Sequence, residues 1–114
     1  MKEKPIVEPA SAGGLTPVLK ASWYAFEVEE FPPACQGRIV RGMLYEQVDA
    51  VAAGCISTFL KTGALDDECL AMLDDTLVRL LEMAAASPDA DERAYFTRLG
   101  EIGLEVRAAA RPAP

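Results

Sequence analysis

Apolar residues recur every three or four positions between about residues 38 and 61, which is the spacing of one face of an α-helix. The stripe consists of Val40, Leu44, Val48, Val51, Cys55 and Phe59. Gly63 follows it, and a glycine just past a helix commonly adopts the left-handed conformation that ends the helix. The pattern predicts an amphipathic helix over residues 38–61. Because glycine disfavours a helix, Gly37 and Gly42 leave open the alternative that the helix becomes regular only after Met43.

Two further helices are predicted over about residues 66–86 and 88–110. Asp66 can cap the first of them, and acidic residues follow it where the helix dipole favours them. Ser87 and Pro88 are typical of the cap and the first turn of the second helix. The apolar faces comprise Leu70, Leu73, Leu77, Leu80, Leu81 and Ala84 in one helix, and Tyr95, Phe96, Leu99, Ile102, Val106 and Ala109 in the other.

The segment at residues 17–30 fits two structures. Aromatic and β-branched residues alternate with alanine and glutamate in its second half, as they do in a strand. Leu19, Trp23 and Phe26, however, would share one face of a helix. We favour an extended aromatic arm at residues 22–31, because three glutamates near its end would oppose a helix dipole.

These elements predict an all-α fold, an antiparallel three-helix bundle with an N-terminal extended aromatic arm. Residues 1–14 hold prolines, glycines and mixed charge, a composition that predicts a disordered, flexible tail. Residues 15–114 are expected to form a single helical domain. Gly100 and Gly103 cost about 1 kcal/mol each relative to alanine inside a helix, so a closely packed neighbouring helix is the expected compensation.

Composition excludes several classes of function. The chain has 114 residues, 51% of them hydrophobic, and no histidine, which removes Ser–His and Cys–His nucleophile pairs and histidine-bound metals. A net charge of -7 repels phosphate backbones and anionic lipids, so neither nucleic acid nor a membrane is expected as a partner. Three cysteines without a Cys-x-x-Cys pair, and no secretory signal, indicate reduced thiols in a cytoplasmic protein.

The acidic residues are concentrated in one part of the chain, since residues 66–92 contain nine of them and a single arginine, Arg79. One interpretation is a solvated helix face with capping acids, and the other is an electronegative surface for a protein partner with a basic surface. Asp74, Asp75 and Glu82 form the candidate partner-binding surface. Asp74 and Asp75 lie in the middle of the predicted helix, where neither capping nor the helix dipole explains an acidic pair. Arginines at positions 38, 41, 93, 98 and 107 are expected to pair with this helix across the bundle.

No catalytic, metal or cofactor site is expected. An EF-hand loop starting at Asp89 would have Ala94 in place of its glycine and Gly100 in place of its bidentate acid. Cys35, Cys55 and Cys69 lack an evident activating base and are interpreted as packing residues.

The sequence is most consistent with a small non-enzymatic protein that acts through protein–protein interaction, as a regulator, adaptor, immunity protein or antitoxin. The alternatives are a structural subunit of a homo-oligomer and a carboxylate-based enzyme. A bundle of this size buries only about 60% of its unfolded surface, so we expect a homodimer or an obligate heteromer with Trp23 and Phe26 at the interface. Many alanines and arginines with few lysines are typical of a bacterium.

Overall fold

The structure is a computed structural model that describes residues 17–110. The elements in chain order are α2 (Pro17–Glu27), the short 3-10 helix η2 (Pro33–Cys35), β1 (Ile39–Val40), β2 (Met43–Leu44), α3 (Tyr45–Thr62), α4 (Asp67–Ala86) and α5 (Ala90–Ala109). The predominantly helical class is confirmed. The three-helix bundle is not, since the described residues contain four α-helices and a small antiparallel hairpin. The tail predicted at residues 1–14 lies outside the described residues.

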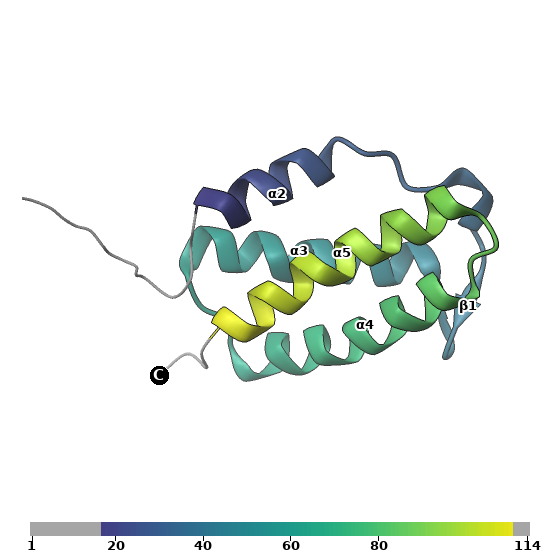
Figure 1. Cartoon of the computed structure of the whole chain (residues 1–114). Coiled ribbons are helices and arrows are strands. Elements are labelled where there is room, and N and C mark those ends of the chain that lie inside the picture. Colours follow the sequence, from purple (N-terminus) through teal and green to yellow (C-terminus); the bar gives the residue numbers. More distant parts are fainter. Residues whose placement is uncertain (1–16, 111–114) are drawn as a thin grey trace, which may run out of the picture.

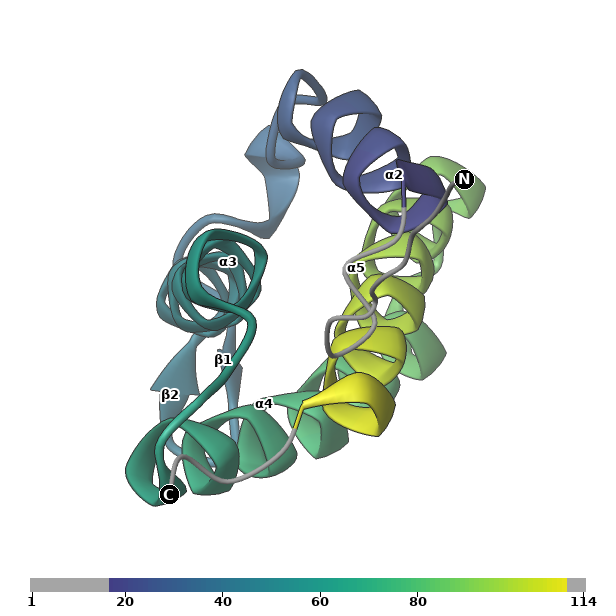
Figure 2. The same cartoon turned by 90° about the vertical axis from the view of Figure 1, so that its left-hand side faces the viewer.

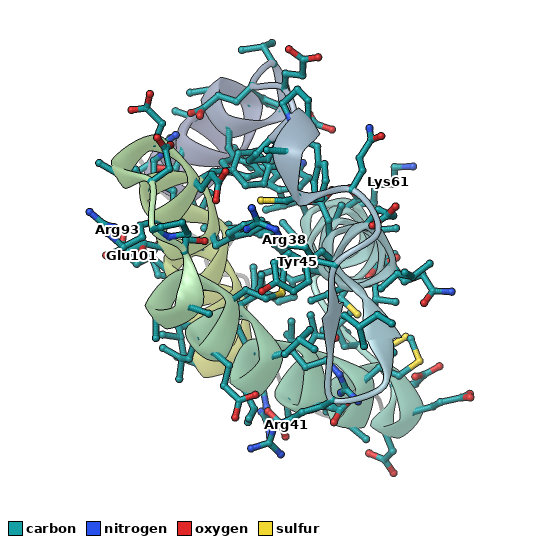
Figure 3. The ribbon with its side chains drawn as sticks, turned by 90° about the vertical axis from the view of Figure 1, so that its right-hand side faces the viewer. Arg38, Arg41, Tyr45, Lys61, Arg93 and Glu101 are labelled. Atoms are coloured by element: carbon teal, nitrogen blue, oxygen red, sulfur yellow. The ribbon has the colours of Figure 1, made fainter. Side chains whose placement is uncertain are left out.

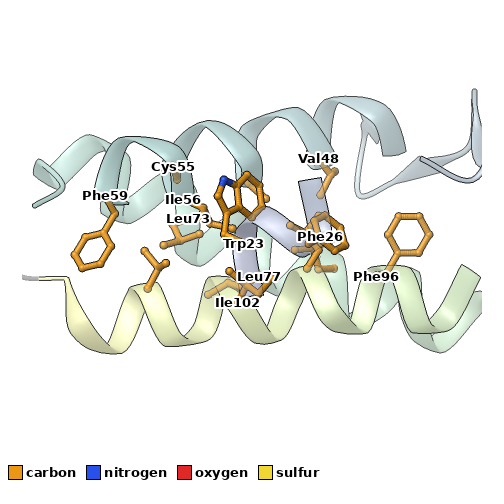
Figure 4. Close-up of a cluster of buried hydrophobic side chains, with 14 of the residues drawn as sticks. Trp23, Phe26, Val48, Cys55, Ile56, Phe59, Leu73, Leu77, Phe96 and Ile102 are labelled. Atoms are coloured by element: carbon orange, nitrogen blue, oxygen red, sulfur yellow. The ribbon is translucent and has the colours of Figure 1, made fainter. Parts of the chain in front are cut away.

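The four helices surround a common interior. Helices α4 and α5 form the most extensive pair, α3 packs against α4, and α2 lies along α5 on the side opposite α4 (Figures 1 and 2). Large side chains from all four helices meet between them, among them Trp23, Phe59, Leu73 and Phe96 (Figure 4). Among the described helices, none is long and apolar enough to cross a membrane.

Residues 22–27 of the predicted extended arm belong to helix α2 (Pro17–Glu27), so the prediction of an extended arm was wrong there, and residues 28–31 form the turn and loop that follow. Its buried residues are Leu19, Trp23 and Phe26, which follow the helical spacing noted in the sequence. Opposition by glutamates to a helix dipole costs about 0.3–1 kcal/mol, whereas burial of each large apolar side chain contributes about 1.5–3 kcal/mol. Tertiary packing therefore outweighs the local preference for an extended chain. Glu29, just past the helix, pairs with Arg98 of α5.

The helix predicted from residue 38 begins at Tyr45 instead, in agreement with the alternative of a late start. Residues 39–44 form the β1–β2 hairpin, in which Ile39 pairs with Leu44 and Val40 with Met43. Arg41 and Gly42 make its two-residue turn with φ values of 48° and 78°, as a primed hairpin turn requires. The side chain of Arg79 anchors this turn to α4 by donating to the carbonyl oxygens of Val40 and Arg41.

The helix ends are set by local side-chain chemistry. Gly63 closes α3 in the left-handed conformation, and Asp66 caps α4 by accepting from the backbone N–H of Cys69 at 2.8 Å, both as predicted. The start of α5 differs from the prediction by two residues. Asp89, not Ser87, caps it by accepting two backbone N–H groups, while the Ser87 hydroxyl donates to the Met83 carbonyl at the end of α4.

Gly103 marks the close approach of α4 and α5 that the sequence suggested. A Cβ atom at this position would lie 2.8 Å from Cδ2 of Leu77, whereas a Cβ at Gly100 would lie 3.9 Å from the Leu80 Cβ. Gly103 therefore allows the two helices to pack tightly, and Gly100 one turn earlier leaves ordinary space.

Candidate functional site

The three acids assigned to the partner-binding surface are each paired with an arginine. Asp74 accepts from Arg107 of α5 at 2.6 Å, Asp75 pairs with Arg79, and Glu82 accepts two hydrogen bonds from Arg41. The hydrogen bonds from Arg41 lower the pKa of Glu82. Sequence position brings only Arg79 near these acids, whereas the fold adds Arg41 and Arg107 from distant segments. The negative potential of the acidic surface is therefore weaker than its formal charges imply. Its role in partner binding stays a prediction.

Trp23 and Phe26 lie inside the chain and not on its surface. Their exposed fractions are 4% and 5%, and their rings stack with centroids 5.9 Å apart. Phe26 also contacts the Tyr95 ring of α5, with a centroid distance of 4.8 Å. The reason for assigning them to an interface, an arm without a partner in its own chain, is thus removed by helix α2.

The residues between α2, α3 and α5 include one unusual carboxylate. Asp49 of α3 accepts a 2.7 Å hydrogen bond from the Tyr95 hydroxyl, and burial raises the pKa of Asp49. Burial and the neighbouring Asp49 also raise the pKa of Tyr95. Within the described residues, no arginine or lysine pairs with Asp49. Asp49 and Tyr95 can hold a proton between them across this hydrogen bond. A carboxylate-based enzyme site, however, uses a pair of carboxylates, and only one carboxylate with a raised pKa is present here.

Replacing Asp49 by asparagine is expected to leave the free energy of unfolding at pH 7 unchanged or slightly higher, and to flatten its pH dependence. Asparagine still accepts from Tyr95 but carries no charge to desolvate. Because the folded pKa is raised, the native chain binds the proton more tightly. Wild-type stability should therefore fall as the pH rises from the ordinary value of 3.8 through the folded pKa.

Urea unfolding of the wild type and of Asp49→Asn between pH 4 and 8 measures this effect. Glu105→Gln, at an exposed position, is the control for the loss of one negative charge. A clear loss of stability at pH 7 in Asp49→Asn alone would show that the charge of Asp49 stabilises the fold.

A larger cavity of about 560 Å³ opens between the loop after α2 and the start of α5. Its carboxylates are mostly engaged in the fold itself: Glu29 pairs with Arg98, Glu92 pairs with Arg38, and Asp89 caps α5. In the described part of the chain, no three cysteine or acidic side chains gather to hold a metal ion. The cavity is therefore an acidic surface hollow without an assembled reactive group.

The three cysteines are in environments that favour the thiol. Burial raises the pKa of Cys35 and of Cys55, and a hydrogen bond to Asp66 raises the pKa of Cys69. The Cys55 Sγ lies 3.8 Å from the carbonyl oxygen of Cys69, where it fills the contact between α3 and α4. These surroundings support the interpretation of the cysteines as packing residues.

An apolar groove runs along the outer side of the α4–α5 pair. Leu81 and Leu104, which flank it, are 68% and 53% exposed, and Val78 on α4 is also exposed. The groove has a volume of about 270 Å³. Its lining consists of Leu77, Leu80, Leu81, Ala84, Phe96, Thr97, Gly100, Glu101 and Leu104. We call this side of the molecule, with the exposed residues of both helices, the α4–α5 face.

Sequence reasoning missed this face. It placed Leu81 on the buried stripe of its helix, because apolar spacing does not tell which edge of a wide stripe a neighbouring helix covers. The signal available in the sequence was the width of that stripe, since Leu77, Leu80 and Leu81 together span more than one contact surface. The structure brings the stripe beside Gly100, where no side chain fills the groove.

Comparison with known proteins provides no family or function for this chain: no family model matches it, and neither a curated protein nor a solved structure is similar to it.

Proposed function

We propose that this is a non-enzymatic protein that acts through protein–protein interaction, and that the α4–α5 face is its contact surface. The observation that carries the proposal is the pair of exposed leucines, Leu81 and Leu104, beside an open apolar groove. Burial of each in an interface would contribute about 1.5–3 kcal/mol. A contiguous apolar surface of this kind is typical of a site that another chain covers.

The groove suits a helix better than a small molecule. It lies between two antiparallel helices, it is lined almost entirely by carbon, and its only charged lining residue is Glu101. Small-molecule sites combine an apolar cavity with several converging polar groups, which this groove lacks. Helix-in-groove recognition requires only an apolar face on the partner, with residues spaced by three and four.

Two other functions rank lower. A structural subunit of a homo-oligomer would use the same exposed apolar face, and differs in that assembly with its own copies would be its whole role. A carboxylate-based enzyme is third, since Asp49 and Tyr95 form the only pair of this kind that we identify in the described residues. A cytoplasmic location, a basic partner surface, and the lack of a cofactor, nucleic-acid or membrane partner remain part of the proposal and rest on charge and composition.

The α4–α5 face is tested by comparing four tagged chains as baits in extracts of the organism that encodes the protein. The baits are the wild type, Leu81→Glu/Leu104→Glu, Asp74→Asn/Asp75→Asn, and the control Val28→Glu. Val28 is more exposed than either leucine and lies just past α2, away from the α4–α5 face. All four should fold, because the replaced side chains are exposed, and circular dichroism checks this.

We expect a protein that the wild type and Val28→Glu enrich at least tenfold more than Leu81→Glu/Leu104→Glu does. Partial loss with Asp74→Asn/Asp75→Asn would add the acidic surface to the binding site. If every enriched protein, including untagged copies of this chain, stays bound to the leucine variant, the α4–α5 face is not the contact surface.

A further inference from the structure

The exposed residues of the α4–α5 face form two stripes, one on each helix. The α4 stripe contains Val78, Leu81 and Ala85, and the α5 stripe contains Arg93, Thr97, Glu101 and Leu104, with the half-buried Gly100 between them. Figure 3 shows Arg93 and Glu101 on the same outer side of α5. Both are exposed, and the Arg93 guanidinium donates one hydrogen bond to the Ser87 carbonyl oxygen at the end of α4. The face is therefore apolar along its middle, with one positive and one negative side chain on the α5 stripe.

The contacts between α4 and α5 fix which residues lie at the same level. Gly100 lies against Leu80, and Gly103 lies against Leu77, so each step along α5 corresponds to a step back along α4. Continued by one turn, this register places Thr97 of α5 beside Met83 of α4. On each helix, a residue a given number of positions before this point can then be compared with the residue the same number of positions after it.

The face is complementary to itself about this level. If a second copy is placed on it by a two-fold axis that crosses both helices at Thr97, each helix meets its own counterpart in the antiparallel direction. Leu81 then faces Ala85 of the partner subunit, and Leu104 faces Ala90 of the partner subunit. Arg93 faces Glu101 of the partner subunit. Each large side chain thus meets a small one, and each charge meets its opposite.

We propose that the occupant of the α4–α5 face is a second copy of this chain, in a two-fold homodimer with its axis at Thr97. This inference rests on the proposed function, and it names the partner that the α4–α5 face binds. Four helices, α4 and α5 from each copy, would then enclose the leucines that one chain leaves exposed. The other occupants, a helix of a different protein and residues 1–16 of the same chain, are outcomes of the tests below.

The charge of the face favours a second copy. The whole chain carries -7, so most orientations of two copies bring like charges together. On this face Arg93 and Glu101 have opposite signs, and Asp74 at its edge is already paired with Arg107. Two copies can approach here without the repulsion that the rest of the surface produces.

The area is also of the required order. Two helices of 20 residues are each about 30 Å long, and side by side they are about 20 Å wide, which gives roughly 600 Å² of face per copy. Stable protein interfaces bury about 800 Å² per partner. The α4–α5 face is thus close to the size of a standard interface before any flanking loop contributes.

The first test measures the mass of the full chain in solution, for the wild type and for variants in which charges on the α4–α5 face are reversed. Sedimentation equilibrium should give twice the 12.2 kDa of one chain. Arg93→Glu and Glu101→Arg should each weaken dimerisation about tenfold, since two pairs become like-charged, and the double variant should restore it to within about threefold. Glu27→Arg, the same charge change at an exposed position on α2, away from the α4–α5 face, is the control and should have little effect.

A monomer at 100 µM would overturn the inference, and so would a dimer that the double charge reversal fails to restore. Neither result contradicts the proposed function, which fails only if the leucine variant retains every bound protein. A monomer that dimerises once residues 1–16 are removed would identify that segment as the occupant and would likewise overturn the inference.

The second test is a crosslink at the proposed axis. Thr97→Cys should form a disulfide between two copies under mild oxidation, because each Thr97 faces its own counterpart. Thr58→Cys, at an exposed position on α3, should remain monomeric in a non-reducing gel. Equal crosslinking of both variants, or none at Thr97, would contradict the position of the axis.

Discussion

Replacing Phe96 by alanine is expected to lower the free energy of unfolding by about 3–5 kcal/mol. Phe96 is 0% exposed and packs edge-on against the rings of Phe31, Tyr45 and Tyr95. Its removal leaves a cavity between α3, α5 and the loop that carries Phe31, and the neighbouring rings can fill it only in part. Urea unfolding followed by circular dichroism measures the change.

The exposed Leu81→Ala is the matched control for Phe96→Ala, and in a monomeric sample its effect should stay within about 0.5 kcal/mol. A loss below 1 kcal/mol at Phe96 would mean that α5 presents a different face to the interior. Since small domains are stable by only about 5–15 kcal/mol, the expected loss removes a large part of the total.

Replacing Trp23 by alanine is expected to cost a similar amount, about 3–5 kcal/mol. Trp23 and its neighbour Phe26 hold α2 against α3 and α5, so the loss of the indole ring should release the whole helix. Tyr24→Ala is the control one residue away, because that ring is 59% exposed. The measurement is the unfolding midpoint in urea together with the helical signal before unfolding.

Trp23 also reports directly on its surroundings, since it is the only tryptophan in the chain. Its fluorescence should be shifted to the blue in the native wild type and should not change on dilution through the dimer–monomer transition. A red shift on dilution would place Trp23 at an interface between chains, as the sequence alone suggested, and not in the core of one chain.

Local patterns were sufficient for the three long helices and for two of their ends. The apolar stripes of α3, α4 and α5 predict buried faces that the structure largely has, because the periodicity of a helix is a property of the chain itself. Gly63 and Asp66 act within four residues of their own positions, so their roles could be recognised without the fold. The late start of α3 was visible only as an alternative, through the glycines before Met43.

The candidate site could not be predicted in the same way, because it depends on which side of each helix is left uncovered. Leu81 is as apolar as Leu80, yet one is exposed and the other buried. The difference arises from the position of α5, which Gly103 brings close to Leu77 on one side of α4 only. No pattern within α4 contains that information.

The sequence by itself determined that this chain is predominantly helical, where its three long helices lie, and that its acids are concentrated near α4. The tertiary structure alone decided that residues 17–27 are helical, since that depends on burying Leu19, Trp23 and Phe26 against distant helices. It also decided that Arg41 and Arg107 neutralise Glu82 and Asp74. Propensity and capping act over one or two turns, whereas burial and ion pairing join residues far apart in the chain, and only the fold fixes those neighbours.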